Sequence, residues 1–292
     1  MYQPHCQFTV YMPLAYGVTH PGIRAESENC GITMKQLDNV HFGFLDLQTS
    51  GYSTKLSSIN CDKIRVRGHD TLITTNRVAA KDLLDIETTN FPVILKNTQS
   101  AKVRATTRNS SILLKGVSGG RIEAETKDAK IHSDRVVCND LVLKTSNAKV
   151  AVEATSADLM QIVTSNSSIK GAWTIGNMLT LTTSNSKIEG TVQLKNPSIQ
   201  ASMFFHTSNG KISIRLPAIS FRGGFDATTT HAEAQILRDS SNPLLPPVRY
   251  TVDSKNRKQG TVGEPHEHRH ALMANTSNAK IAIALNGPDP LH

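Results

Sequence analysis

Hydrophobic positions recur along most of this chain in columns that repeat every 19 residues. Each repeat is marked by an Asn or Asp, and an apolar residue stands three positions after every mark: Val93, Ile112, Ile131, Val150, Ile169, Ile188, Ile212 and Ile281. Two more apolar columns stand four and six positions before the mark, separated by mostly polar positions. This alternation has the period of two that indicates a strand with one buried face. The pattern predicts two short strands and two turns in each 19-residue unit.

The fold class follows from the size of the repeat. A unit of two short strands cannot bury its own apolar face, but copies stacked in register share one continuous core. We therefore expect an all-β protein, a parallel β-solenoid with about 19 residues per coil. Aromatic residues make up only 5% of the chain, so the narrow core is expected to consist of Ile, Val, Leu and Ala.

The repeated Asn or Asp is expected to have a structural role at a turn. Both residue types tolerate left-handed backbone and bond nearby backbone groups, and stacked side chains about 4.8 Å apart can bond their equivalents in adjacent coils. A Thr stands two positions earlier in every copy, as in Thr183-Ser184-Asn185. The predicted structural ladder consists of Asn90, Asn109, Asp128, Asn147, Asn166, Asn185, Asn209 and Asn278.

The two ends of the chain keep the period poorly. Residues 1–50 are interpreted as an N-terminal cap with the first strands, among them 8–12, and residues 51–216 as solenoid repeats. Residues 217–271 break the period and predict irregular coils with protruding loops at about 239–247 and 254–270. Within this stretch, 233–237 and 248–252 have the composition of strands. Residues 272–292 are expected to form the final coil, which closes the stack, and a tail.

Lysine often stands two positions after the repeated Asn or Asp. Because side chains alternate between strand faces, these lysines should form a stripe outside the apolar columns: Lys130, Lys149, Lys187, Lys211 and Lys280, with Lys170 beside it. One interpretation is a solvated face that protects strand edges. The other is a linear cationic track for an extended polyanion.

Charge and hydropathy limit the class of partner. The formal net charge is +8, which favours acidic partners such as anionic polysaccharide, nucleic acid or a membrane surface. The sequence has no specific nucleic-acid motif, and no stretch approaches the roughly 18 consecutive apolar residues of a transmembrane segment.

Candidate metal and thiol chemistry is sparse. His266, His268 and His270 stand at alternate positions, so in an extended segment they would point to one side, where they could ligate zinc, copper or nickel or form a pH-sensitive patch. The alternative is a solvated loop. Cys6, Cys30, Cys61 and Cys138 show no metal-ligand spacing. A Cys6–Cys30 disulfide in an oxidising compartment and four isolated thiols both stay open, and no cofactor is expected.

A short acidic patch raises the question of catalysis. Asp85, Glu87, Glu123 and Glu125 occupy outward positions on successive strands, interrupted by Arg104. β-Helix enzymes that act on acidic polysaccharides cluster such residues, and glycoside hydrolysis uses two carboxylates at a defined separation. Later coils place other residue types in these positions, and no nucleophile elbow, phosphate loop or zincin motif occurs. The sequence therefore predicts no catalytic residues.

The phrase Thr-Ser-Asn followed by a small residue, Lys and Ile resembles the repeats of an adhesin-like β-solenoid family of unknown function, found in bacterial envelope proteins and in many fungal proteins. The stretch 216–225, followed by a long excursion and a last Thr276-Ser277-Asn278 coil, is similar to the fungal branch. The resemblance covers roughly residues 80–285. It implies a β-solenoid that works at a cell envelope or cell wall.

The expected function is therefore that of a non-enzymatic, adhesin-like β-solenoid that binds a polymer or protein surface. Its expected partners are acidic or cell-wall polysaccharide, or a protein. The first alternative is an intracellular structural or scaffold solenoid, favoured because Met1-Tyr2-Gln3-Pro4-His5 lacks the basic and apolar regions of a signal peptide. The second is a polysaccharide-active β-helix enzyme. The localisation stays open, with the cell surface suggested by the resemblance.

Overall fold

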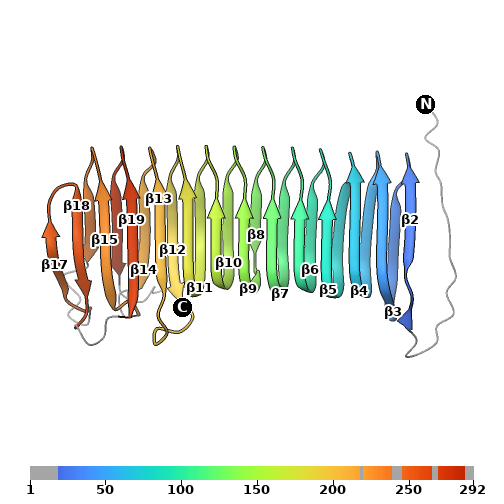
Figure 1. The fold of residues 1–292 in the computed structure, drawn as a ribbon, viewed down its shortest axis with the longest axis horizontal. Helices are drawn as coiled ribbons and strands as arrows, with labels where there is room; N and C mark the ends of the chain where they lie inside the picture. Colours follow the sequence, from blue (N-terminus) through green and yellow to red (C-terminus); the bar gives the residue numbers. More distant parts are fainter. Residues whose placement is uncertain (1–18, 218–219, 239–244, 265–268, 287–292) are drawn as a thin grey trace. The chain divides into compact units, whose positions relative to one another are not determined.

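The computed structural model describes residues 19–217, 220–238, 245–264 and 269–286. These residues form strands β1 to β20 joined by turns, with no helix among them. The predicted fold class, an all-β parallel β-solenoid, is confirmed (Figure 1). Within the described part, no helix is long and apolar enough to span a membrane. The chain divides into two compact units, Met1–Asn139 and Asp140–His292.

Unit 1 is a stack of long strands that pair in parallel, from β2–β3 through to β7–β8. The strands are β1 (Thr19–His20), β2 (Ile23–Glu28), β3 (Ile32–Ser50), β4 (Ser53–His69), β5 (Leu72–Glu87), β6 (Val93–Thr106), β7 (Ile112–Glu125) and β8 (Ile131–Asp134); the boundary of the unit falls within β9 (Val137–Lys144). The stacking already begins at β2, within the segment interpreted as a cap. The strand expected at 8–12 lies outside the described residues.

Each long strand from β3 to β7 contains one left-handed residue in its first half, where the chain bends. The φ angle is 58° at Gln36, 57° at Ser58, 53° at Arg77, 47° at Asn97 and 63° at Gly116, and the parallel register stacks these residues in one column. Gly and Asn adopt this conformation readily, whereas other residues do so at a cost of about 1–2 kcal/mol. In β3 to β7, the second turn expected in the coil is therefore a bend inside a continuous strand.

The other turn is the Thr-Ser-Asn segment, whose Thr is buried in every copy from Thr88 to Thr276. Thr183 Oγ1 donates to two carbonyl oxygens of the adjacent turn, Ser167 O at 3.0 Å and Ser165 O at 3.4 Å. The same paired contacts are made by Thr107, Thr126, Thr164, Thr207, Thr229 and Thr276. The hydroxyls thus satisfy carbonyl groups that the tight turn directs into the stack.

The predicted apolar columns form the core of each unit. Ile86, Val93 and Ile112 in unit 1, and Ile169 and Ile188 in unit 2, are fully buried. Burial of one such side chain contributes about 1.5–3 kcal/mol, so repetition along the stack supplies most of the stability.

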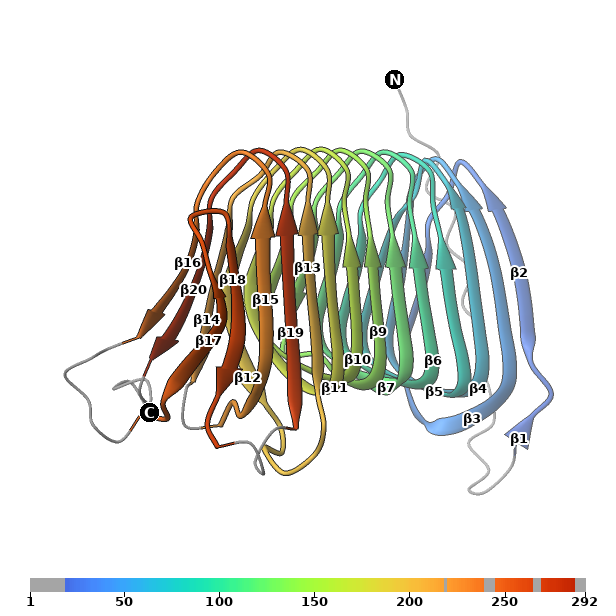
Figure 2. The same ribbon diagram turned by 60° about the vertical axis from the view of Figure 1, so that its left-hand side comes forward.

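Unit 2 has coils of the same kind, but their order in space differs from their order in sequence. Its strands are β10 (Val150–Val163), β11 (Ile169–Thr183), β12 (Ile188–Leu194), β13 (Ser202–Thr207), β14 (Ile212–Pro217), β15 (Gly223–Thr229), β16 (Ala234–Arg238), β17 (Val248–Asp253), β18 (Arg257–Val262), β19 (His270–Thr276) and β20 (Ile281–Asn286). β19 pairs with both β13 and β15, and β20 pairs with both β14 and β16. The expectation that the last coil closes the stack is therefore wrong: Figure 2 shows β19 between β13 and β15.

An antiparallel hairpin covers the β15 edge instead. β17 and β18 pair with each other, and β18 pairs antiparallel with β15. The strands expected at 233–237 and 248–252 are confirmed as β16 and β17. The loop expected at 254–270 is wrong over residues 257–262, which form β18. Because β18 pairs with β15, the hairpin occupies the strand edge on which another parallel coil would otherwise stack.

Candidate functional site

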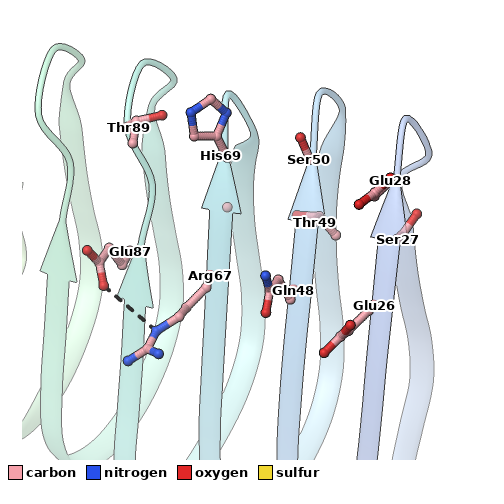
Figure 3. A pocket seen from close by; sticks show the side chains of 11 residues that line it. Glu26, Ser27, Glu28, Gln48, Thr49, Ser50, Arg67, His69, Glu87 and Thr89 are labelled. Atoms are coloured by element: carbon pink, nitrogen blue, oxygen red, sulfur yellow. Dashed lines mark ion pairs between the residues drawn. The ribbon is translucent and has the colours of Figure 1, made fainter.

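A polar groove of about 440 Å³ lies on the outward face of β2 to β5 in unit 1 (Figure 3). Its volume falls within the range of ligand pockets. The groove is lined by Glu26, Ser27, Glu28, Gln48, Thr49, Ser50, Arg67, Gly68, His69, Glu87 and Thr89. Every lining residue except Gly68 carries a hydroxyl, amide, carboxylate, guanidinium or imidazole group, so the groove suits a ligand rich in hydrogen-bonding groups.

Parallel register brings these side chains together from four strands. Glu26 pairs with Gln48, Gln48 with Arg67, and Arg67 with Glu87, which forms one row across the groove. A second row nearer the turns contains Glu28, Ser50 and His69 (Figure 3). Successive coils are about 4.8 Å apart, so the rows offer polar groups at a regular spacing.

The groove carries charges of both signs. Arg67 Nε lies 3.8 Å from Glu87 Oε2, and both side chains are exposed. His69 Nδ1 lies 3.5 Å from Asp70 Oδ2, outside the lining. An exposed pair at such a distance contributes little to stability, so Arg67 and Glu87 can exchange this contact for a ligand hydroxyl group at low cost. The mixed lining favours a neutral polar ligand over a polyanion.

A column of alternating charge runs beside the groove and includes part of the acidic patch. Register places Arg24, Asp46, Arg65, Asp85, Arg104 and Glu123 next to one another. Arg24 Nη2 lies 2.9 Å from Asp46 Oδ2, and Arg65 Nε lies 3.7 Å from Asp85 Oδ2. Glu87 pairs with Arg67 and Glu123 with Arg121. Three carboxylates of the patch, Asp85, Glu87 and Glu123, are thus paired with arginine, so they form surface ion pairs.

The lysine stripe is divided between the units. Lys130 lies in unit 1 and is exposed, whereas Lys149, Lys170, Lys187, Lys211 and Lys280 lie in unit 2. Lys280 Nζ lies 3.8 Å from Glu233 Oε2. Lys170 and Lys187 share one carboxylate, Glu189, with Nζ to Oε2 distances of 3.0 and 2.9 Å.

This shared carboxylate neutralises part of the stripe. The hydrogen bond from Lys187, supported by that from Lys170, lowers the pKa of Glu189 to about 2. In return, the hydrogen bond to Glu189 raises the pKa of Lys187. A polyanion would have to displace Glu189 before it could use these two ammonium groups, which weakens the case for a continuous cationic track in unit 2.

The repeated Asn side chains bond from coil to coil. In unit 2, Asn166 Nδ2 donates to Asn147 Oδ1 at 2.7 Å, Asn185 to Asn166 and Asn209 to Asn185 at 2.8 Å, and Asn278 to Asn209 at 2.6 Å. In unit 1, Asn109 donates to Asn90 at 2.7 Å and Asn90 donates to Asp70. At Asp128, the backbone N–H donates to Arg108 O. These side chains are exposed, so the bonds form at the surface of each turn.

His270 has a structural environment, while His266 and His268 lie outside the described residues. Ala201 N donates to His270 Nδ1 at 3.3 Å, and His270 Nε2 lies 3.1 Å from Pro197 O. The ring also stacks on Phe221, and burial lowers its pKa. With both nitrogens bonded, His270 has none to offer a metal. No cluster of three or more His, Cys, Asp or Glu suited to a metal occurs in residues 19–217, 220–238, 245–264 and 269–286.

Of the described cysteines, Cys61 and Cys138 are buried and Cys30 is partly exposed. Cys30 and Cys61 are free thiols, and Cys6 lies outside the described residues. Burial raises the pKa of the Cys61 thiol to about 11, which keeps it protonated and inert at neutral pH.

Comparison with protein-family models, with curated proteins and with solved structures finds no match. The resemblance to adhesin-like solenoids thus rests on the repeated Thr-Ser-Asn phrase and on the stretch from residue 216 to the last coil.

Proposed function

We propose that this protein is a non-enzymatic, adhesin-like binding protein that holds a polar polymer of the polysaccharide class in the groove of unit 1. The observation that carries the proposal is the groove lining, which combines amide, hydroxyl, carboxylate, guanidinium and imidazole groups on one rigid face. Such groups match the hydroxyl groups of a carbohydrate, which both donate and accept hydrogen bonds.

The stacked geometry favours an extended ligand. Each coil adds one outward side chain per row, as the Glu26, Gln48, Arg67 and Glu87 row illustrates. A polymer lying across the strands meets a new polar group about every 4.8 Å, and its contacts accumulate without distortion of the sheet. A solenoid is suited to this role because its repeated coils create extended binding surfaces.

The charge balance of the groove narrows the ligand class. The lining contains three carboxylates, of Glu26, Glu28 and Glu87, beside Arg67 and His69. A strongly anionic polymer would meet these carboxylates, so a neutral cell-wall polysaccharide is the favoured ligand. The adhesin-like resemblance supports a site of action at a cell surface.

A glycan-array screen with neutral and anionic polymers, at low and physiological salt, tests the proposal. Binding of a neutral glycan is expected to survive physiological salt, because hydrogen bonds to uncharged hydroxyl groups are screened less than ion pairs. The exposed pair Gln48→Ala and Arg67→Ala should reduce binding at least about tenfold, which corresponds to roughly 1.4 kcal/mol.

The matched control is Lys149→Ala with Lys211→Ala, which changes the stripe and leaves the groove intact. Binding that is lost with this control but kept with the groove variant would refute the groove and favour a cationic track. The absence of any glycan ligand would refute the polysaccharide class and favour a scaffold role with protein partners.

A further inference from the structure

The last coil of the described chain, formed by β19 and β20, lies between two coils that precede it in sequence. On one side, Ala271 N donates to Ala201 O at 2.9 Å, and Ile212 N donates to Lys280 O at 3.1 Å. On the other side, His231 N donates to Ser277 O at 2.9 Å, and Ile281 N donates to Glu233 O at 3.0 Å. Both backbone edges of this coil are therefore bonded to coils that are not its neighbours in sequence.

Side chains as well as the backbone hold the coil in this place. Leu272, Ala274, Ile281, Ile283 and Leu285 are buried in the core of unit 2. Thr276 and Asn278 make the same turn contacts as in other coils, with Gly210 O at 3.2 Å and Asn209 Oδ1 at 2.6 Å.

Contacts unique to this coil lie at its start. The His270 ring bonds to Pro197 and Ala201 in the loop between β12 and β13, and Arg269 Nη1 donates to Ser198 O at 2.8 Å. Gly223 lies so close that a Cβ atom there would be 1.9 Å from His270 O. These contacts specify this segment at this position, which the repeated coil pattern alone would not do.

The space that the coil fills is bounded by segments that are joined to each other without it. The coil β13–β14 connects to β15–β16 through residues 218–222, and the β17–β18 hairpin packs on β15. Residues 263–269 lead from the hairpin into the coil. The coil β19–β20 thus fills a slot whose two sides are the parallel strand edges of β13–β14 and of β15–β16.

We propose that this slot, between β13–β14 and β15–β16, is a strand-acceptor site for the segment His270–Asn286, and that a second copy of the chain fills it with the same segment to give a coil-exchanged dimer. The hydrogen bonds and buried side chains described above join the segment to its slot, so all of them are preserved when the segment comes from another copy. Exchange of an identical element costs little at equilibrium because the same interactions form in the dimer as within one chain. Strand addition to open edges is an established mode of recognition between chains.

Cysteine pairing between full-length chains tests the exchange. Ser202 on β13 and Ala271 on β19 are partners in the parallel register and are partly exposed. One chain carries Ser202→Cys and the other carries Ala271→Cys, so neither can form this pair alone. The chains are mixed in moderate urea, diluted and oxidised, and covalent dimers are measured on non-reducing gels.

The matched control replaces Ala271→Cys with Met273→Cys, two residues further along the same strand. Met273 is the register partner of Phe204, so its Cα lies beyond the roughly 7 Å limit for a disulfide with residue 202. The proposal predicts several-fold more covalent dimer with the matched pair. Equal yields from both pairs would overturn exchange. The double variant Ser202→Cys/Ala271→Cys should form the bond within one chain, and failure to do so would overturn the slot itself.

Discussion

The buried Thr of each turn offers the sharpest test of what stabilises the stack. Thr183 is fully buried, and its hydroxyl donates to Ser167 O at 3.0 Å and to Ser165 O at 3.4 Å. Ser165 O also accepts from the backbone N–H groups of Ser184 and Asn185. Replacement of Thr183 by Val keeps the branched shape and puts a methyl group in place of the hydroxyl. Ser165 O keeps its two backbone donors, so Ser167 O is the acceptor that is most affected by the lost hydrogen bond.

The expected cost follows from that loss. A net hydrogen bond contributes about 1 kcal/mol, and a buried acceptor left unsatisfied costs about 1–3 kcal/mol. Thr183→Val should therefore lower the free energy of unfolding by about 2 kcal/mol. The matched control is Thr182→Val, one residue earlier on the outward face, which should change it by less than about 0.5 kcal/mol.

Urea unfolding followed by circular dichroism measures both variants. The midpoint is expected to fall for Thr183→Val with an unchanged slope, because the surface exposed on unfolding is the same. Equal midpoints for the two variants, within error, would refute the reasoning that these hydroxyls satisfy buried carbonyl groups.

Three further predictions concern the surface turns, the shared carboxylate and the buried imidazole. Asn185→Ala removes bonds to two neighbouring Asn side chains and should cost about 1 kcal/mol in urea unfolding; no change would contradict a stabilising role. Glu189 has a pKa lowered from 4.5 to about 2, so its contribution is present above pH 4.5 and is lost as the pH falls towards 2. The stability difference between the protein and Glu189→Gln should shrink over that interval, and a constant difference would be inconsistent with this pairing. Burial lowers the pKa of His270 below 6.5, so the unfolded chain takes up the proton first and stability should fall as the pH drops below 6.5; His270→Gln should reduce this slope, and an unaltered slope would assign it to other groups.

The regular coils could be predicted from sequence because each position in the repeat has one physical task. Apolar columns such as Ile169 and Ile188 face the core, and the Thr-Ser-Asn phrase marks the turn. The role of the Thr hydroxyl was missed, although its presence in every copy was a signal: a buried turn needs donors for its inward carbonyl groups, and Thr supplies one.

The position of the last coil could not be predicted from the repeat. β13, β15 and β19 direct Phe205, Ala227 and Ala274 inward at equivalent register positions. The repeat pattern therefore allows any of these strands to pair with either of the other two. Their order in space depends on particular contacts, above all those of His270 with residues 197–201. Such contacts leave no periodic signal.

The groove was missed for a related reason. The regular period begins near residue 84, so it identifies Asp85 and Glu87 without their partners Arg65 and Arg67. The earlier coils differ in length, which hides the register that aligns Glu26 with Gln48. The spacing of Arg65 and Arg67 two residues apart, 20 residues before Asp85 and Glu87, was the available signal.

Side-chain footprinting with a photoactivated carbene, with and without a glycan selected by the array, tests the proposed function most directly. We predict that the bound glycan protects Glu26, Gln48, Arg67 and His69 and leaves the stripe residues Lys149 and Lys211 equally labelled. Protection confined to the lysine stripe, or equal labelling of the groove with and without glycan, would contradict the proposed binding site.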